Sequence, residues 1–160
     1  MSGPLFFLHI PKTAGTSLRR SLERACNERM VECYPPFDEG NPVNKTGPLK
    51  DNAVVYGHLS WGVHTFYGAQ PNYAAILREP VERVISWYGH KRASAVLDST
   101  GEVARNTLAD LVAAGHPELN NHMTQIVSGM NLTPSNGEAA LALACENLKN
   151  FAWVSTNRRL

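Results

Sequence analysis

The chain has 160 residues, a length that predicts one domain over residues 1–160. Its hydrophobic share of 43% and its charged share of 18% exclude a chain that is disordered over most of its length. A formal net charge of +1 excludes the broad basic field of non-specific nucleic-acid binders, so we expect no nucleic-acid partner and only local anion sites. The longest apolar run near the N-terminus, starting at Leu5, is far shorter than the roughly 20 residues of a membrane helix. With no signal-peptide pattern and three widely spaced cysteines, we expect a cytoplasmic protein without a membrane span.

The first predicted strand, Leu5 to Ile10, is followed by a loop, Pro11 to Gly15, and by a helix that begins at Thr16 or Ser17 and ends near Glu28. The first-turn amides of a helix have no intrahelical partner and carry partial positive charge, and the lysine of the loop adds a full charge. We predict a phosphate or phosphosulfate site over seven consecutive residues: Pro11, Lys12, Thr13, Ala14, Gly15, Thr16 and Ser17. The alternative is an ordinary helix cap beside a solvent-facing lysine.

The rest of the chain alternates between predicted strands and predicted helices. Further strands are expected at Met30–Tyr34, Ala53–Tyr56, Tyr73–Leu77 and Phe151–Ser155, and further helices at Pro80–Ala95, Val103–Ala114, Leu119–Val127 and Gly137–Asn150. The stretch Pro35–Asp51 is predicted to be a long surface loop, and Leu59–Gln70 has no clear period. This alternation predicts an α/β fold in three layers, with a central parallel sheet flanked by helices.

Three polar segments follow predicted strands directly. They are Pro11–Ser17, Gly57–His58 and Arg78–Pro80, and they should lie at one edge of the sheet, because ligands of such folds bind at the carboxyl ends of the strands. The guanidinium of Arg78 and the hydroxyl of Ser86 are placed to hold a second phosphate. The alternative is that the arginine pairs with a nearby carboxylate and that the serine is an ordinary helical residue.

The histidine that follows a strand is the best candidate for a general base. Among six histidines, position favours His58 first and His64 second as the group that accepts a hydroxyl proton. The spacing of the histidines and cysteines does not match a metal site, so no metal is expected. Four aromatic residues offer either an acceptor pocket or core packing: Trp61, Phe66, Tyr67 and Trp87.

Two common enzyme signatures are absent. The phosphate loop of nucleoside triphosphatases needs two glycines before its lysine, whereas here Gly15 follows Lys12. No Gly-x-Ser-x-Gly elbow of a serine hydrolase occurs. A small nucleotide kinase therefore remains only a weak alternative.

The same segments resemble the carbohydrate sulfotransferases over most of the chain. Phe7 to Leu18 looks like the 5′-phosphosulfate loop of that family, and Leu77 to Tyr88 looks like its 3′-phosphate-binding motif. Val55 to Ser60 is similar to the segment with a catalytic histidine in the branch of uronyl and heparan sulfate 2-O-sulfotransferases and their bacterial relatives. Asn121–Gly129 and Asn150–Val154 are weaker similarities.

The resemblance implies a sulfotransferase fold related to the P-loop nucleotide kinases. It implies that 3′-phosphoadenosine-5′-phosphosulfate (PAPS) is the donor and adenosine 3′,5′-bisphosphate (PAP) is the product, with no metal. The acceptor would be a hydroxyl of a carbohydrate or a small metabolite.

The resemblance also implies a role for each matching residue. Lys12 would stabilise charge on the oxygen that bridges sulfate and phosphate, and Arg78 with Ser86 would bind the 3′-phosphate. His58 would take the proton of the acceptor hydroxyl. The 5′-phosphate would be held by Thr13, Gly15, Thr16 and Ser17.

The end of the sequence departs from the family pattern. Family members continue past a Val-Gly-Leu-Thr-Glu-Arg motif, whereas here Val154 to Leu160 replaces it and the sequence stops. We therefore expect a C-terminally shortened sulfotransferase domain. The alternative function is a catalytically inactive nucleotide-binding or interaction domain of the same fold.

Overall fold

The computed structural model describes residues 3–35, 43–93 and 100–159. These residues belong to two compact units, and each unit is described by itself. The first unit comprises Met1–Leu77 and Met123–Leu160, and the second comprises Arg78–His122. The expectation of one domain over residues 1–160 stays a prediction.

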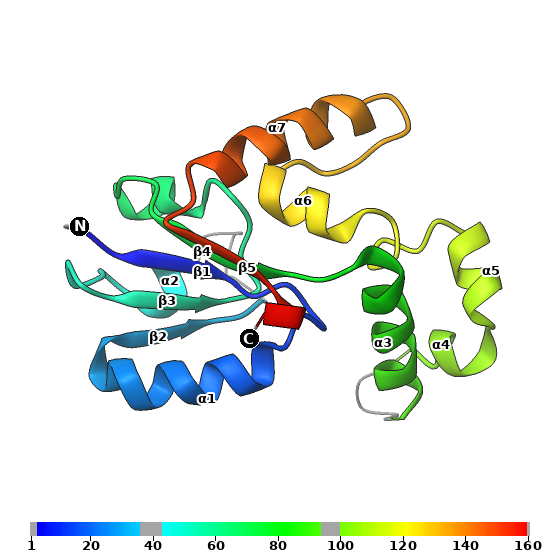
Figure 1. The fold of residues 1–160 in the computed structure, drawn as a ribbon, viewed down its shortest axis with the longest axis horizontal. Coiled ribbons are helices and arrows are strands. Elements are labelled where there is room, and N and C mark those ends of the chain that lie inside the picture. The colour runs from blue at the N-terminus through cyan, green and yellow to red at the C-terminus, as the bar shows by residue number, and fades with distance from the viewer. Residues whose placement is uncertain (1–2, 36–42, 94–99, 160) are drawn as a thin grey trace. The chain divides into compact units, whose positions relative to one another are not determined.

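A five-stranded parallel sheet forms the centre of the first unit (Figure 1). The strands are β1 (Leu5–Leu8), β2 (Met30–Cys33), β3 (Val54–Gly57), β4 (Tyr73–Leu77) and β5 (Trp153–Thr156). Their order in the sheet is β2-β3-β1-β4-β5, and every neighbouring pair is parallel. The predicted α/β fold class is therefore confirmed, and the carboxyl ends of all strands lie at one edge.

The helices of the first unit cover both faces of the sheet. Helix α1 lies on one side, and α6 and α7 lie on the other (Figure 1). The bounds are α1 (Gly15–Cys26), α2 (Val43–Thr46), α6 (His122–Ser128), whose first residue belongs to the second unit, and α7 (Gly137–Lys149), with short 3-10 turns η1 (Asn27–Arg29), η3 (Val63–Tyr67) and η4 (Asn157–Arg159). No helix in the described part of the chain combines the length and the apolar character that crossing a bilayer requires.

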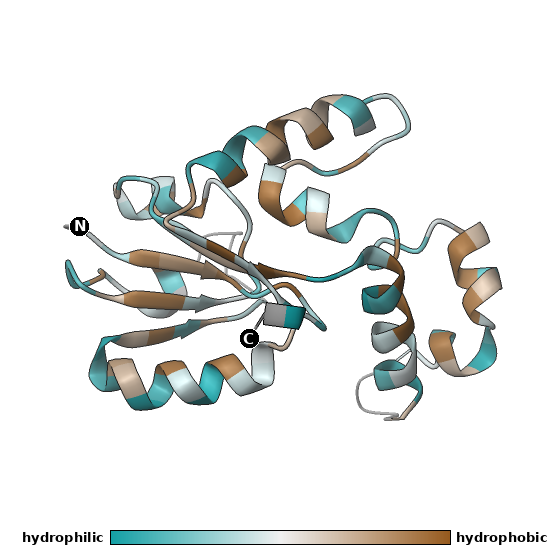
Figure 2. Ribbon diagram, in the orientation of Figure 1, coloured by the Kyte–Doolittle hydropathy of each residue, from teal (hydrophilic) through white to brown (hydrophobic). Residues whose placement is uncertain are grey.

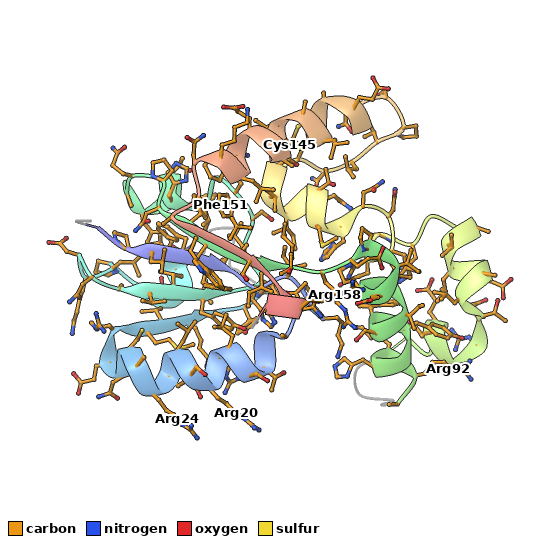
Figure 3. The ribbon with its side chains drawn as sticks, viewed as in Figure 1. Arg20, Arg24, Arg92, Cys145, Phe151 and Arg158 are labelled. Atoms are coloured by element: carbon orange, nitrogen blue, oxygen red, sulfur yellow. The ribbon has the colours of Figure 1, made fainter. Side chains whose placement is uncertain are left out.

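The sheet is apolar on both faces, as the sequence of β1 indicates. Phe6 and Leu8 are buried against α6 and α7, where they meet Ile126, while Phe7 packs on the opposite face toward Leu22 of α1. Figure 2 shows the central strands as hydrophobic and α1 as mixed. Two arginines of α1, Arg20 and Arg24, extend into solvent (Figure 3). Helix α1 therefore buries one stripe and exposes a basic one.

The second unit consists of α3 (Pro80–Arg92), α4 (Glu102–Arg105) and α5 (Leu108–Ala113). Trp87, Val103 and Leu111 form its buried core. The guanidinium of Arg83 is also buried and donates to the backbone carbonyl of Glu118. This bond ties α3 to the segment that follows α5.

Two predicted elements differ from the structure. The single helix predicted over Val103–Ala114 is wrong, because the chain breaks at Thr107, which starts α5 with a capping box shared with Asp110. The predicted loop Pro35–Asp51 contains the short helix α2, and its residues 36–42 lie outside the described residues, as do residues 94–95 of the predicted helix Pro80–Ala95. Helix α3 itself ends at Arg92.

Candidate functional site

The loop between β1 and α1 has the backbone shape of an anion site. Lys12 and Ala14 have positive φ angles of 72° and 73°, and Thr13 between them does not. Neighbouring residues of alternating handedness direct successive N–H groups into one concavity. Helix α1 begins at Gly15, and its N-cap, Ala14, has no side-chain capping bond. The first-turn amides of α1 are therefore not taken by a cap, as the helix-cap alternative would require.

The hydroxyl side chains of the loop divide into two kinds. Thr13 is 2% exposed, and its hydroxyl donates to the carbonyl of Ile10 at 2.9 Å. This hydroxyl therefore stabilises the loop, and the group of Thr13 that remains for a phosphate is its backbone amide. Thr16 and Ser17 are exposed on the first turn of α1, and Lys12 is half-buried.

Four aromatic rings gather beside this loop at the carboxyl edge of the sheet. His9 stacks on Tyr56, with ring centroids 4.9 Å apart and planes inclined by 21°. The ring of His58 lies 5.0 Å from His9 and 4.8 Å from Tyr34. The Nδ1 atom of His9 is hydrogen-bonded to the hydroxyl of Tyr34 at 3.0 Å. The cluster joins the ends of β1, β2 and β3.

Gly15 is held by the two stacked rings of this cluster. The hydroxyl of Tyr56 donates to the carbonyl of Gly15 at 2.8 Å. The ring of His9 lies directly against the α-carbon, because a Cβ added to Gly15 would sit 1.8 Å from Nε2 of His9. No side chain other than hydrogen fits at residue 15 without movement of the ring.

The rings next to Gly15 are electrically neutral. Burial lowers the pKa of His9 to about 4, and the nearby charges of His58 and Arg19 act in the same direction. Burial also raises the pKa of Tyr56 and of Tyr34 above the usual phenol value. At neutral pH both phenols therefore keep their protons and act as hydrogen-bond donors.

His58 is exposed and follows directly after β3. The residue before His58 is Gly57, and β3 and β2 approach closely there. A Cβ added to Gly57 would lie 1.6 Å from the carbonyl oxygen of Cys33 in β2, so only glycine fits. The backbone amide of His9 also donates to the carbonyl of Gly57 at 2.8 Å. The end of β3 is thus held from both sides, and the loop of β1 and His58 are brought together as predicted.

Arg78 and Ser86 belong to the second unit, whereas the loop and His58 belong to the first. Arg78 is the residue after β4, and its Nε lies 3.5 Å from Oε2 of Glu82. The ion pair expected as the alternative is therefore present. Ser86 is half-buried within α3. The 3′-phosphate role of this pair stays a prediction.

The second-choice histidine has a different environment. His64 lies in η3, and its Nδ1 is 2.6 Å from the hydroxyl of Tyr73. Burial lowers its pKa. Its neighbours Trp61 and Tyr73 pack with the core on the α6 and α7 side of the sheet, so His64 has the contacts of a structural residue.

Most of the four aromatic residues named as pocket candidates are in fact core residues. Trp61 stacks on Tyr73 at 4.5 Å, Tyr67 packs on Phe6, and Trp87 is buried in the second unit. Phe66 is 52% exposed and lines a cavity of about 530 Å³. That cavity is built from residues that precede strands, among them Pro4, Asp51 and Gln70, so it lies at the edge of the sheet opposite to His58. Among the described residues, no three His, Cys, Asp or Glu side chains gather as metal ligands.

Sequence reasoning did not identify His9, Tyr34 and Tyr56 as parts of the site. A signal for His9 and Tyr56 exists in the strand period. His9 shares a face with Phe7, and Tyr56 precedes His58 by two positions, so both point to the α1 side at strand ends.

Comparisons with known proteins identify the family of this chain. A model of the sulfotransferase family matches residues 2–127, a range that includes the loop, His58, Arg78 and Ser86. The chain belongs to the sulfotransferase family. The carbohydrate branch is not distinguished by this match and stays a prediction. A comparison with curated proteins finds no match.

A solved structure with the same fold also belongs to a sulfotransferase. Mouse sulfotransferase SULT7A1, complexed with PAP, matches this family member with a TM-score of 0.59 and 16% sequence identity. The match covers 96% of this chain and 52% of the mouse chain, so this chain spans about half the length of that neighbour. At this identity the likeness shows the fold alone.

Proposed function

We propose that this chain transfers a sulfuryl group from PAPS to a hydroxyl of a sugar or small metabolite. The observation that carries the proposal is the loop Pro11–Ser17, with its alternating backbone and uncapped helix start, beside the exposed ring of His58. The sulfotransferase family match adds the kind of anion that the loop would hold. The mouse neighbour in complex with PAP supports the choice of nucleotide.

The donor would lie with its 5′-phosphosulfate on the loop. The amides of Thr13 to Ser17 and the hydroxyls of Thr16 and Ser17 would bind phosphate oxygens, because they lie on or next to the first turn of α1. Pro11 would hold the turn, and Lys12 would place its ammonium at the bridging oxygen. Arg78 and Ser86 would bind the 3′-phosphate, which ADP and ATP lack.

The reaction exchanges one sulfur–oxygen bond for another. The acceptor hydroxyl oxygen attacks sulfur, the bond from sulfur to the bridging oxygen breaks, and that oxygen stays on the 5′-phosphate of PAP. His58 takes the proton that the hydroxyl loses, and such a base contributes about 10²–10⁴-fold to rate. Lys12 and the loop amides stabilise the negative charge that develops on the leaving oxygen. Positioning and charge stabilisation are the main requirements of this kind of transfer.

Binding and transfer are tested separately. Isothermal titration should show PAP bound more tightly than ADP, and equal affinities would refute the role of Arg78 and Ser86. With labelled PAPS and a panel of sugar and small-alcohol acceptors, Lys12→Ala should lower the transfer rate about 100-fold or more. The matched control is Lys149→Ala, which removes an exposed lysine that forms an ion pair with Glu146 of the same helix, α7, and should leave transfer unchanged.

The base is tested by pH. The pH profile of the transfer rate should lack, in a His58→Ala variant, the part that depends on the protonation of the base. An unchanged profile would mean that another group accepts the proton. If PAP binds but no acceptor in the panel is sulfated, the result would favour the alternative of a nucleotide-binding domain without catalysis. Turnover of ATP would instead support the alternative of a small nucleotide kinase.

A further inference from the structure

His9 makes contacts that the proposed function does not use. It lies between the last residue of β1 and the phosphate loop, and its backbone amide extends the pairing of β1 with β3 by one bond to Gly57. Its ring is fixed on three sides, by the stack on Tyr56, the bond from Nδ1 to the Tyr34 hydroxyl and the α-carbon of Gly15. The ring cannot turn without breaking at least one of these contacts.

The geometry points to His9 as a positioning residue of the donor site, whose ring sets where α1 begins and hence where its first-turn amides meet the 5′-phosphate. This inference rests on the proposed function, because it assigns His9 a part in holding the donor. His9 is not placed as a catalytic residue, since its Nδ1 is bonded to Tyr34 and its Nε2 faces Gly15.

The need for such a support follows from the loop itself. Lys12 and Ala14 have left-handed backbones, a conformation that is unfavourable for a residue with a side chain. The loop keeps this shape only if its surroundings hold it. The bond from Thr13 to Ile10 is one such hold. Gly15 is another, through the ring of His9 against its α-carbon and the Tyr56 hydroxyl on its carbonyl.

The effect of Gly15→Ala on the melting temperature should depend on whether the ring of His9 is present. Gly15 is helical and its φ is not in the left-handed region, so alanine would normally be preferred there. The three atoms nearest to an added methyl group all belong to the ring of His9. Gly15→Ala should therefore lower the melting temperature of the wild-type chain but raise it, or leave it unchanged, in a His9→Ala background.

The functional readout is the affinity for PAP in the same double-mutant cycle. We expect Gly15→Ala to weaken PAP binding about tenfold or more, because the first turn of α1 must shift. The variant that carries both His9→Ala and Gly15→Ala should bind PAP about tenfold more tightly than Gly15→Ala alone, a coupling typical of residues in contact. Additive effects of the two changes on PAP affinity would overturn the inference.

The matched control is His64→Ala. Like His9, His64 has a pKa lowered by burial and an Nδ1 bonded to a tyrosine hydroxyl, but it contacts Trp61 and Tyr73 on the other side of the sheet. It should lower the melting temperature without changing PAP affinity and without coupling to Gly15→Ala. Coupling of similar size at His64 would refute a specific role for His9. If His9→Ala does not fold, His9→Asn, which also removes the ring edge, takes its place in the cycle.

Wild-type binding separates this inference from the function on which it rests. If the wild-type chain does not bind PAP, the proposed donor site is wrong and the inference falls with it. If the wild-type chain binds PAP and the cycle is additive, the donor site stands and only the role of His9 is refuted.

Discussion

Substitutions of two buried tyrosines should affect stability and donor binding to different extents. Tyr56 lies in β3 and Tyr73 in β4, the two strands that flank β1. Both side chains are fully buried, and each hydroxyl is hydrogen-bonded. The hydroxyl of Tyr56 donates to the carbonyl of Gly15 at 2.8 Å. The hydroxyl of Tyr73 has three contacts: the amides of Gly62 and His64 at 3.1 and 3.2 Å, and Nδ1 of His64 at 2.6 Å.

The expected magnitudes follow from these bonds. Tyr56→Phe removes the hydrogen bond to Gly15, which should cost about 1 kcal/mol and lower the melting temperature by roughly 2–4 °C. Tyr73→Phe leaves two amide donors and a ring nitrogen without their partner, which should cost about 2–4 kcal/mol. Tyr56→Phe, although milder for the fold, should weaken PAP binding about threefold to tenfold, because the bond it removes holds the first residue of α1.

Thermal melting and isothermal titration with PAP should therefore rank the two variants in opposite orders. Tyr73→Phe should be the less stable protein and should bind PAP within about twofold of wild type. If Tyr73→Phe weakened PAP binding as much as Tyr56→Phe, affinity would simply follow stability, and the link from Tyr56 to Gly15 would have no special role. If Tyr56→Phe lowered the melting temperature but left PAP affinity unchanged, the role of the Tyr56 bond in donor binding would also be refuted.

Two further predictions concern pH and the second unit. The folded-state pKa of His9, about 4, lies below the ordinary histidine value of 6.5. The unfolded chain therefore binds the extra proton, and stability should fall as the pH drops from about 6.5 to 4. Urea unfolding across this range should show a shallower pH slope for His9→Gln, and an identical slope would contradict the assigned burial of the ring. Thr107→Ala removes the capping box with Asp110 and should cost about 1 kcal/mol, measured as faster amide exchange in α5. Unchanged exchange in α5, with α7 as the reference helix, would show that tertiary packing alone starts the helix.

The sheet could be predicted from the sequence because its strands are short apolar runs between turn residues. Tyr73–Leu77 is predicted with its observed bounds, since both faces are buried and Pro80 starts the next helix. The break at Thr107 is also visible in the sequence, as a threonine followed three residues later by Asp110, but the apolar period continues across it. At Thr107 the capping bonds with Asp110 start a new helix, although the apolar helical period continues across this residue.

The candidate site could be predicted only in part. Lys12 and His58 stand out because their segments follow buried strands directly, and the parallel order of β1 and β3 then brings these segments to one edge, where ligands of such folds bind. His9 and Tyr34 could not be placed in the same way. The strand period indicates the face on which His9 lies, but not its partners. The ring-to-ring contact and the hydrogen bond between His9 and Tyr34 join strands that are distant in sequence, and no local pattern encodes them.

The left-handed residues of the loop have a consequence for the entropy of binding. Lys12 and Ala14 have this backbone although neither is glycine, so the loop has fewer conformations open to it than a glycine-rich loop would have. The buried bond from Thr13 to Ile10 reduces that number further. An anion that reaches this loop meets amides that already converge, and little of its binding free energy is spent on ordering them.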